Sequence, residues 1–310
     1  MSIIVKTENI KLKTFMFITV FTPTYNRATL LPRLYESLCR QTYRDFEWVV
    51  VDDGSVDDTH YVVESFMNGN DNENGNNNFP IRYFYQENGG KHRAINRGVQ
   101  EAKGELFLIL DSDDSLPDCS LEKIVDVYAQ VKEDDSFGGV CGYMAHHDGT
   151  VIGNGNDDDI LDTNTIDLRY RYNVKGDMCE VFRTSVLKEN PFPEIDREKF
   201  CPEALVWNRI AQKYRLRVFH EVIYYRDYLD NGLTDRIVKI RMNSPIASMM
   251  CYQEMSELDI PLLQKIKAAI NYWRFRFCSN KSEKPVLKWH WNWVMPIGYL
   301  LHRKDKKRER

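Results

Sequence analysis

The sequence lacks the features that mark secreted, zinc-binding and membrane-spanning chains. Its seven cysteines are scattered, with no CxxC pair, so neither a disulfide framework nor a zinc site is expected. The N-terminal stretch MSIIVKTENIKLKTFMFITVFTPTYN has charges and amides where a signal peptide has a continuous apolar segment. No apolar run is long enough for a membrane-spanning helix. We therefore expect a cytoplasmic protein.

The sequence also lacks a strong excess of charge. A formal net charge of −4 gives no general attraction to nucleic acid, and no nucleic-acid partner is expected. A chain of 310 residues, 43% of them hydrophobic, can bury one substantial core and carry a second, smaller region.

Strand-like and helix-like segments alternate from about residue 16. Apolar β-branched runs predict strands at 16–22, 47–53, 81–86 and 105–110. Helical spacing predicts helices at 28–41, 58–67, 91–104 and 121–131, the second capped by Asp57 and the third ended by Gly104. The polar segment 68–78 is typical of a surface loop. This order predicts β-α-β units around a parallel sheet.

The alternation weakens beyond residue 136. Further strands are expected at 137–146 and 216–225, with a helix at 203–214. From about Arg236 the pattern is mostly helical.

Polar residues cluster where each of the first four predicted strands ends. The clusters are Thr22–Asn26, Asp52–Ser55, Asn88–Lys91 and Asp111–Asp114. Parallel sheets of this kind bind ligands at the carboxyl ends of their strands. We therefore expect the four clusters to converge on one edge.

The cluster DSDD places three carboxylates, Asp111, Asp113 and Asp114, directly after an apolar strand. Like charges so close raise the energy of the folded state unless a positive charge lies among them. Oxygen ligands suit Mg²⁺ or Mn²⁺, and such a cation beside a strand end commonly holds phosphate oxygens, as in a nucleotide. The alternative is a turn with a helix cap.

The segment DDGS at 52–55 is similarly either a turn or an acceptor for a nucleobase N–H.

The segment NGGKH at 88–92 does not form a P-loop. Tyr85 stands where that motif has its first glycine, and His92 replaces its Ser or Thr. No GxGxxG follows the first strand, which disfavours a dinucleotide-binding fold. The segment is interpreted as a glycine turn that places Lys91 near phosphate or ribose, with a solvated lysine as the alternative.

Two segments carry a family resemblance: FTPTYNRATLLPRLYESLCRQTYRDFEWVVVDDGSVDDT and ENGGKHRAINRGVQEAKGELFLILDSDD. From about Phe17 to Leu121 the chain resembles the N-terminal half of family 2 glycosyltransferases. The resemblance implies the α/β GT-A fold, a Rossmann-like, mostly parallel sheet flanked by helices. The implied divisions are an extension at 1–15, a GT-A domain at 16–235 (nucleotide-binding half 16–121, acceptor half 122–235) and a helical region with a basic tail at 236–310.

The resemblance also implies the residues of a nucleotide-sugar site. Pro23 and Tyr25 would line the base and ribose pocket, and Asp53 would bind the uracil ring. Asp113 and Asp111 would hold Mn²⁺ or Mg²⁺, with Asp114 close beside them. The full set implied around the nucleotide-sugar is Pro23, Tyr25, Asp53, Asn88, Gly90, Lys91, Asp111 and Ser112.

Inverting members of the family need a base for the acceptor hydroxyl. By resemblance this is Glu203, although Ala204 stands where a second carboxylate often occurs. Asp177 and Glu180 are weaker candidates. A glutamate in the first turn of a helix also interacts favourably with the helix dipole, and a surface turn would explain Asp177.

The resemblance implies an inverting glycosyltransferase that moves a sugar from a UDP-sugar to a saccharide, lipid-linked or free, in cell-surface polysaccharide synthesis. The alternatives are a non-catalytic nucleotide- or saccharide-binding protein on the same fold, and a sugar nucleotidyltransferase. The latter class carries a Gly-rich signature that TPTYNRATLL lacks.

The C-terminal stretch interleaves Trp289, Trp291 and Trp293 with apolar residues and ends in a basic cluster. This composition suits peripheral contact with an anionic membrane, here the inner face. A core strand, a dimer contact or a solvated tail are the alternatives.

Overall fold

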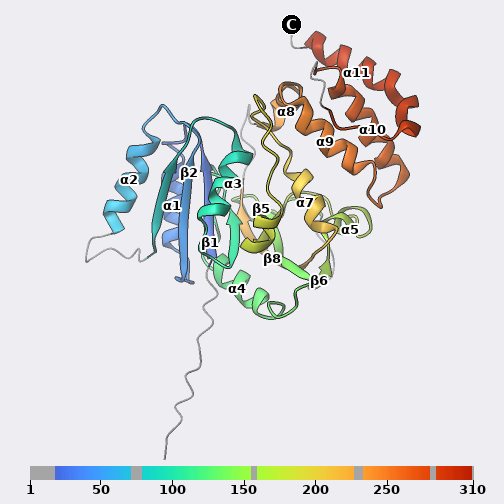
Figure 1. Cartoon of the computed structure of the whole chain (residues 1–310). Helices are drawn as coiled ribbons and strands as arrows, with labels where there is room; N and C mark the ends of the chain where they lie inside the picture. Colours follow the sequence, from blue (N-terminus) through green and yellow to red (C-terminus); the bar gives the residue numbers. More distant parts are fainter. Residues whose placement is uncertain (1–17, 71–78, 155–158, 227–232, 280–283, 309–310) are drawn as a thin grey trace, which may run out of the picture.

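The computed structural model of the chain describes residues 18–70, 79–154, 159–226, 233–279 and 284–308. A central sheet carries helices on both faces, and a group of helices lies at one end of it (Figure 1). The predicted N-terminal extension 1–15, residues 16–17 of the first predicted strand and residues 71–78 of the predicted polar loop lie outside the described residues.

The sheet has eight strands in the order β3-β2-β1-β4-β7-β5-β8-β6. The first four strands pair in parallel, and they are β1 (Ile18–Thr24), β2 (Phe46–Asp52), β3 (Ile81–Tyr85) and β4 (Leu106–Ile109). Strand β7 (Met178–Arg183) runs antiparallel to β4 and to β5 (Phe137–Ala145). Strand β8 (Arg215–Tyr225) is parallel to β5 and antiparallel to β6 (Ile160–Thr163). The predicted mostly parallel sheet is confirmed, with antiparallel strands added beyond β4.

Both faces of the sheet are covered because side chains alternate along its strands. Ile18 and Val20 of β1 belong to one buried cluster with α1 (Leu31–Cys39) and α4 (Ser120–Ala129), and α2 (Thr59–Asn70) also contributes to it. Phe21 points to the other face and packs with α3 (Lys91–Glu101). The helices α6 (Thr184–Glu189) and α7 (Glu203–Ala211) complete that second face. Because both faces of these strands are buried, their sequences do not alternate between apolar and polar residues.

The helix α3 ends at Glu101, so the prediction that Gly104 ends it is wrong. Ala102 already has extended backbone, with φ −60° and ψ 132°. A Cβ atom on Gly104 would lie 2.3 Å from the backbone nitrogen of Thr19. The glycine is therefore needed for the close approach of the chain to β1.

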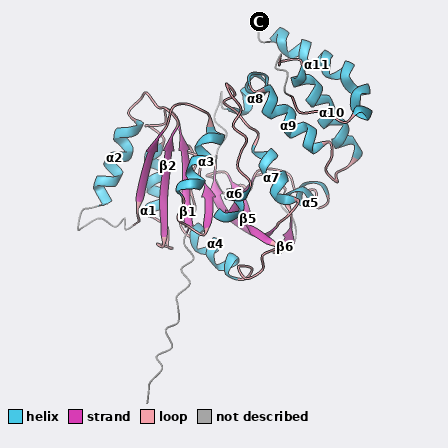
Figure 2. Ribbon diagram, viewed as in Figure 1, coloured by secondary structure: helices cyan, strands magenta, loops and turns pink. Residues whose placement is uncertain are grey.

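The C-terminal region is helical, as predicted. It contains α8 (Leu233–Asn243), α9 (Pro245–Met255), α10 (Leu262–Arg276), the 3₁₀ helix η1 (Trp289–Val294) and α11 (Met295–Arg308). Figure 2 shows these helices gathered at one side of the strands. The buried Glu198 accepts the backbone N–H groups of Ile246 and Ala247 at 2.8 and 2.9 Å, which ties the start of α9 to the segment before α7.

The three tryptophans of the C-terminal stretch lie in η1, so the core-strand alternative for them is wrong. Among the described residues, no helix has the length and apolarity required to cross a membrane.

Candidate active site

The first two polar clusters meet at the carboxyl ends of β1 and β2. The backbone N–H of Asn26 donates to Ser55 Oγ at 2.8 Å, and the N–H of Val56 donates to Asn26 Oδ1 at 2.9 Å. The N–H of Asp53 donates to the carbonyl oxygen of Thr24 at 2.8 Å. Since the two strands are parallel and in register at these residues, the clusters share one edge of the sheet.

The third cluster is held by Asp53. Its carboxylate accepts the N–H groups of Gly89 and Gly90 at 2.8 and 2.7 Å and the side-chain amide of Gln86 at 2.8 Å. Asn88 Nδ2 donates to the carbonyl oxygen of Asp53 at 2.9 Å. An ionised carboxylate offers about four acceptor positions, so the chain itself takes most of those on the buried Asp53. Asp53 positions the glycine turn, and its contact with uracil stays a prediction.

Substitution of Gly90 by alanine is expected to lower the free energy of unfolding by roughly 2–5 kcal/mol. Gly90 has φ +99°, and a Cβ atom there would lie 1.9 Å from the carbonyl oxygen of Lys199. Urea denaturation measures the loss. The matched control is Gly149→Ala, where φ is +88° but no atom lies within 4 Å of the new Cβ. Equal losses in the two variants would show that the contact with Lys199 is not rigid.

The fourth cluster forms a turn after β4. The N–H of Asp114 donates to the carbonyl oxygen of Asp111 at 3.0 Å. Tyr224 from β8 fixes this turn, because its hydroxyl accepts the N–H of Asp111 at 2.9 Å and donates to Asp114 Oδ2 at 2.7 Å. The helix α4 begins with Cys119 as its N-cap, so the DSDD segment is a turn but not a helix cap.

The three carboxylates of this turn have different surroundings. Asp114 is buried, and burial together with the neighbouring Asp111 raises its pKa to about 7. Asp111 and Asp113 are half-buried, and the carbonyl oxygen of Asp113 accepts a hydrogen bond from Arg33. Asp114 therefore belongs to the support of the turn, whereas Asp111 and Asp113 are accessible from outside.

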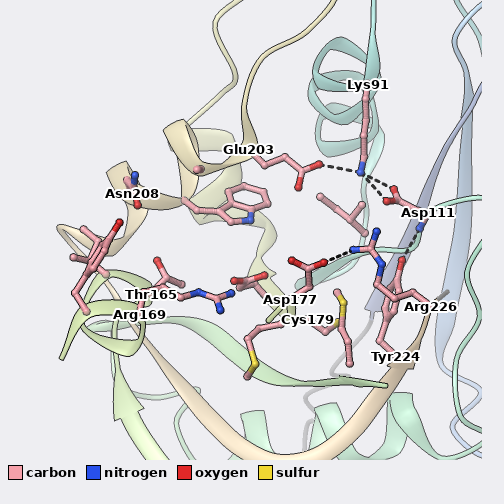
Figure 3. A pocket seen from close by; sticks show the side chains of 18 of the residues that line it. Lys91, Asp111, Thr165, Arg169, Asp177, Cys179, Glu203, Asn208, Tyr224 and Arg226 are labelled. Carbon is pink, nitrogen blue, oxygen red and sulfur yellow. Dashed lines mark hydrogen bonds and ion pairs between the residues drawn. The ribbon is translucent and has the colours of Figure 1, made fainter. Parts of the chain in front are cut away.

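Lys91 joins the third and fourth clusters to Glu203. Its Nζ lies 2.7 and 2.9 Å from the two carboxylate oxygens of Asp111 and 2.9 Å from Glu203 Oε1 (Figure 3). Burial disfavours the charge on Lys91, but the two carboxylates outweigh this and raise its pKa. The solvated-lysine alternative is therefore wrong. Lys91 therefore supplies part of the positive charge that the carboxylates of the turn after β4 require.

Glu203 is the first residue of α7, as predicted, and the structure shows Pro202 as the N-cap of that helix. Its side chain is 41% exposed and turns toward Lys91 (Figure 3). A helix start favours a carboxylate electrostatically, so this position also suits the fold. The ion pair with Lys91 brings Glu203, predicted from the distant half of the chain, to the edge of the sheet.

A cavity of about 320 Å³ opens beside the Lys91 ion pairs. Its lining combines four carboxylates with three cations and an aromatic wall. The charged residues of the lining are Asp111, Asp177, Glu180, Glu203, Lys91, Arg169 and Arg226, and Trp207 and Tyr170 supply aromatic surface. Mixed charges and aromatic rings are suited to a polar ligand with apolar faces, as a sugar ring has.

The two weaker candidates for the base lie in this lining. Asp177 accepts a hydrogen bond from Arg226 Nη1 at 2.9 Å, so it is more than a surface turn (Figure 3). Burial raises the pKa of Glu180 to about 7, against the opposing effect of Arg169. Arg169 in turn donates to the carbonyl oxygens of Val174 and Gly176. Glu180 and Asp177 stay candidates.

The remaining predicted residues lie along the same edge. Pro23 is buried near the end of β1, and Tyr25 follows that strand with 48% of its surface exposed. Ser112 is buried within the turn after β4. An exposed tyrosine at a strand end offers a ring face to a nucleobase, and that role of Tyr25 stays a prediction.

Sequence reasoning missed three side chains that reach the site from other segments. Tyr224 and Arg226 come from the end of β8, and Arg169 comes from α5 (Thr165–Tyr170). The only signal for them was charge and a tyrosine hydroxyl near the end of a predicted strand. Motifs identify residues close in sequence, and these three become neighbours only through the sheet.

The carboxylates of the turn after β4 suit a hard divalent cation that is bound together with a phosphate-containing ligand. Within the described residues, no group of three or more His, Cys, Asp or Glu side chains is arranged to hold a metal ion. Asp111 and Asp113 offer carboxylate oxygens on one turn, and the residues next to them in the sequence are neither Cys nor His. Mg²⁺ is commonly bound by one or two carboxylates together with phosphate oxygens and water. Two carboxylates therefore suffice for a cation shared with a diphosphate.

Comparison with known sequences gives consistent matches. The sequence model of the family described as Glycosyl transferase family 2 matches residues 19–188. Glycosyltransferase GlyG of Streptococcus pneumoniae serotype 4 is 38% identical over 120 residues, which are 38% of this chain and 36% of that protein. The GalNAc(5)-diNAcBac-PP-undecaprenol beta-1,3-glucosyltransferase of Campylobacter jejuni is 26% identical over 224 residues, 70% of this chain and 67% of that protein. The match thus spans little more than a third of GlyG.

Solved structures show the same fold. TarS from S. aureus, residues 1-349 in complex with UDP-GlcNAc, superposes with a TM-score of 0.54 at 21% identity over 84% of this chain and 73% of that chain. The mannosyltransferase PcManGT from Pyrobaculum calidifontis, in complex with GDP-Man and Mn²⁺, gives a TM-score of 0.54 at 19% identity over 94% of this chain and 75% of that chain. At sequence identities of 21% and 19%, these two structures show that this chain shares their fold.

Proposed function

This chain belongs to glycosyl transferase family 2, and from that membership and its GT-A fold we propose that it transfers a sugar from a UDP-sugar to a saccharide hydroxyl with inversion. The acceptor is proposed to be a lipid-linked saccharide of a cell-surface polysaccharide pathway. The observation that carries the proposal is the ion-pair chain Asp111–Lys91–Glu203 at the edge of the sheet beside the cavity. It supports the proposal because it joins Asp111, proposed to lie on the diphosphate side, to Glu203, proposed as the base.

In the proposed reaction the acceptor oxygen bonds to the anomeric carbon of the donor sugar while the bond from that carbon to the UDP oxygen breaks. Glu203 takes the proton of the acceptor hydroxyl as general base. Lys91 holds Glu203 in place through its ion pair, and its charge stabilises the negative charge that develops on the departing UDP. Asp177 and Glu180 are proposed to face the sugars in the cavity.

The nucleotide is proposed to lie along the ends of β1 to β4. Tyr25 and Pro23 would contact the base and ribose, and Asn88, Gly90 and Ser112 would flank the diphosphate. Asp113 and Asp111 would hold Mn²⁺ or Mg²⁺, which neutralises charge on the diphosphate when bound. We propose that the chain divides into a nucleotide half (16–121), an acceptor half (122–235) and a helical region (236–310).

A relative from Campylobacter jejuni supports the lipid-linked acceptor, because its name describes glucosyl transfer to an undecaprenol-linked saccharide. TarS supports UDP as the nucleotide, because it was solved with UDP-GlcNAc. PcManGT was solved with GDP-Man and Mn²⁺, so it supports the cation and makes GDP the necessary control nucleotide.

Calorimetric titration of UDP, with GDP as the control, tests the nucleotide half of the proposal. In Mn²⁺ we expect UDP to bind at least about tenfold more tightly than GDP, a difference of about 1.4 kcal/mol. EDTA is expected to remove most of this binding. Tighter binding of GDP would make GDP-sugars the donors, and no binding in either condition would contradict the site.

A screen of UDP-sugars then tests turnover by measuring UDP release with and without saccharide acceptors. Family membership favours a glycosyltransferase over a sugar nucleotidyltransferase. A protein that binds UDP with metal but never hydrolyses or transfers a donor would instead be a non-catalytic binding protein.

A further inference from the structure

The part of the chain from Val286 to Arg308, within the last described segment, packs against α10 along one narrow stripe. The buried residues of this segment recur every three or four positions: Leu287, Trp291, Val294, Gly298, His302 and Asp305. Gly298 allows contact with α10, since a Cβ there would lie 2.5 Å from that of Trp273. Arg274 makes a two-pronged ion pair with Asp305 at 2.5 and 2.8 Å. The orientation of η1 and α11 is therefore fixed.

The first half of this segment presents apolar side chains to the outside. Trp289 is 82% exposed and Trp293 is 61% exposed, whereas Trp291 between them is buried. We call the exposed set the apolar face: Val286, Trp289, Trp293, Met295, Ile297, Tyr299 and Leu300. Scattered apolar residues are normal on a protein surface, but seven within one short segment mark an interaction surface.

The second half of the segment is positively charged. Its exposed residues, which we call the basic end, are Arg303, Lys304, Lys306, Lys307 and Arg308. The single acidic residue of α11, Asp305, is buried in its ion pair with Arg274. The exposed surface of α11 therefore passes from apolar to purely cationic along the helix.

We propose that the apolar face and the basic end together form a docking surface for an anionic lipid bilayer. Tryptophan and tyrosine are the side chains that favour the boundary between headgroups and acyl chains, and clustered lysine and arginine are attracted to anionic headgroups. Among the described residues no helix is suited to cross a membrane, so the contact is peripheral. This inference requires neither Glu203 nor the nucleotide site.

A second copy of this chain is a poorer occupant of the same surface. In a symmetric dimer each partner presents the same patch. A parallel contact would place five cations against five, and an antiparallel one would place the basic end of each copy against the apolar face of the other. A bilayer with anionic headgroups satisfies both parts of the surface at once.

Co-sedimentation with lipid vesicles tests the proposal on the full chain. We expect binding to vesicles of phosphatidylcholine with phosphatidylglycerol, and weaker binding to phosphatidylcholine alone. The variant W289S/W293S/L300S is expected to lose at least about tenfold in partition, because its apolar contact is removed. The variant K304Q/K306Q/K307Q is expected to lose the preference for phosphatidylglycerol and the weakening by salt.

The matched control is Tyr61→Ser, which removes a 68% exposed aromatic side chain from α2, on the opposite side of the molecule from α11 (Figure 1). It should bind vesicles as the unchanged chain does. Metal-dependent UDP binding and thermal unfolding check that each variant is folded. Absence of vesicle binding by the unchanged chain, or equal binding by W289S/W293S/L300S, would overturn the proposal. A concentration-dependent dimer that this variant abolishes, without vesicle binding, would assign the surface to a second copy.

Discussion

Replacement of Glu203 by glutamine is expected to lower kcat by about 10²- to 10⁴-fold, with little change in the affinity for UDP. Glutamine has nearly the same size and can still fill the start of α7, but its amide cannot accept the proton of the acceptor hydroxyl. Lys91 keeps its ion pair with Asp111 in this variant, so the edge proposed to bind the nucleotide should be preserved. Loss of a general base therefore affects the chemical step and not binding.

The measurement is UDP release from the UDP-sugar that binds best, together with titration of UDP. Glu221→Gln is the matched control. Glu221 also pairs with a lysine, at 2.6 Å from Lys123 Nζ, but it does not line the cavity. The control should keep full turnover. If Glu203→Gln also keeps turnover, the base lies elsewhere, and Asp177→Asn and Glu180→Gln become the next variants.

A purely positioning role of Glu203 can be distinguished from a role as general base by comparing two variants. If Glu203 acted only by fixing Lys91, its loss would weaken UDP binding through the diphosphate side of the site. Lys91→Met would then reproduce the effect of Glu203→Gln. If Glu203 is the base, Lys91→Met weakens UDP binding, whereas Glu203→Gln leaves it and lowers kcat. The two variants together assign the two roles.

The meeting of the four polar clusters at one edge of the sheet could be predicted from the sequence, because each cluster is a local motif. A buried strand followed by polar residues identifies a strand end, and a parallel sheet brings such ends together. The ends of β1, β2, β3 and β4 indeed lie side by side. The individual hydrogen bonds between the clusters at this edge of the sheet could not be predicted from the sequence. The resemblance predicts that Asp53 binds the nucleobase, but no motif predicted that its carboxylate also accepts the N–H groups of Gly89 and Gly90.

The cavity could not be derived from the sequence, because part of its lining comes from segments that no motif marks. Tyr224 and Asp114 are 110 residues apart and meet only because β8 lies beyond β5 and β7 in the sheet. Similarly, Lys91 could be interpreted as solvated until the fold placed it between Asp111 and Glu203. Electrostatic pairing between distant segments depends on the complete topology.

Replacement of Asp113 by asparagine is expected to raise the dissociation constant of UDP in Mn²⁺ by about tenfold or more, to near its value in EDTA. Asparagine keeps the size of the side chain but removes the charge that a hard cation requires. Asp113 is half-buried, with its backbone carbonyl held by Arg33, so the turn itself should persist. The variant is expected to remain folded and to lose most of the difference between Mn²⁺ and EDTA.

Two further variants in the same segment separate a metal ligand from a structural carboxylate. Asp118→Asn removes an exposed carboxylate that pairs with Arg40 at 3.0 Å, and exposed pairs contribute little, so its UDP binding should be unchanged. Asp114→Asn alters the buried partner of Tyr224 and should change thermal stability more than metal dependence. If Asp113→Asn binds UDP with undiminished metal dependence, Asp113 is not a ligand. Loss of that dependence in Asp114→Asn instead would move the cation to the buried side of the turn, where Tyr224 already donates to the carboxylate.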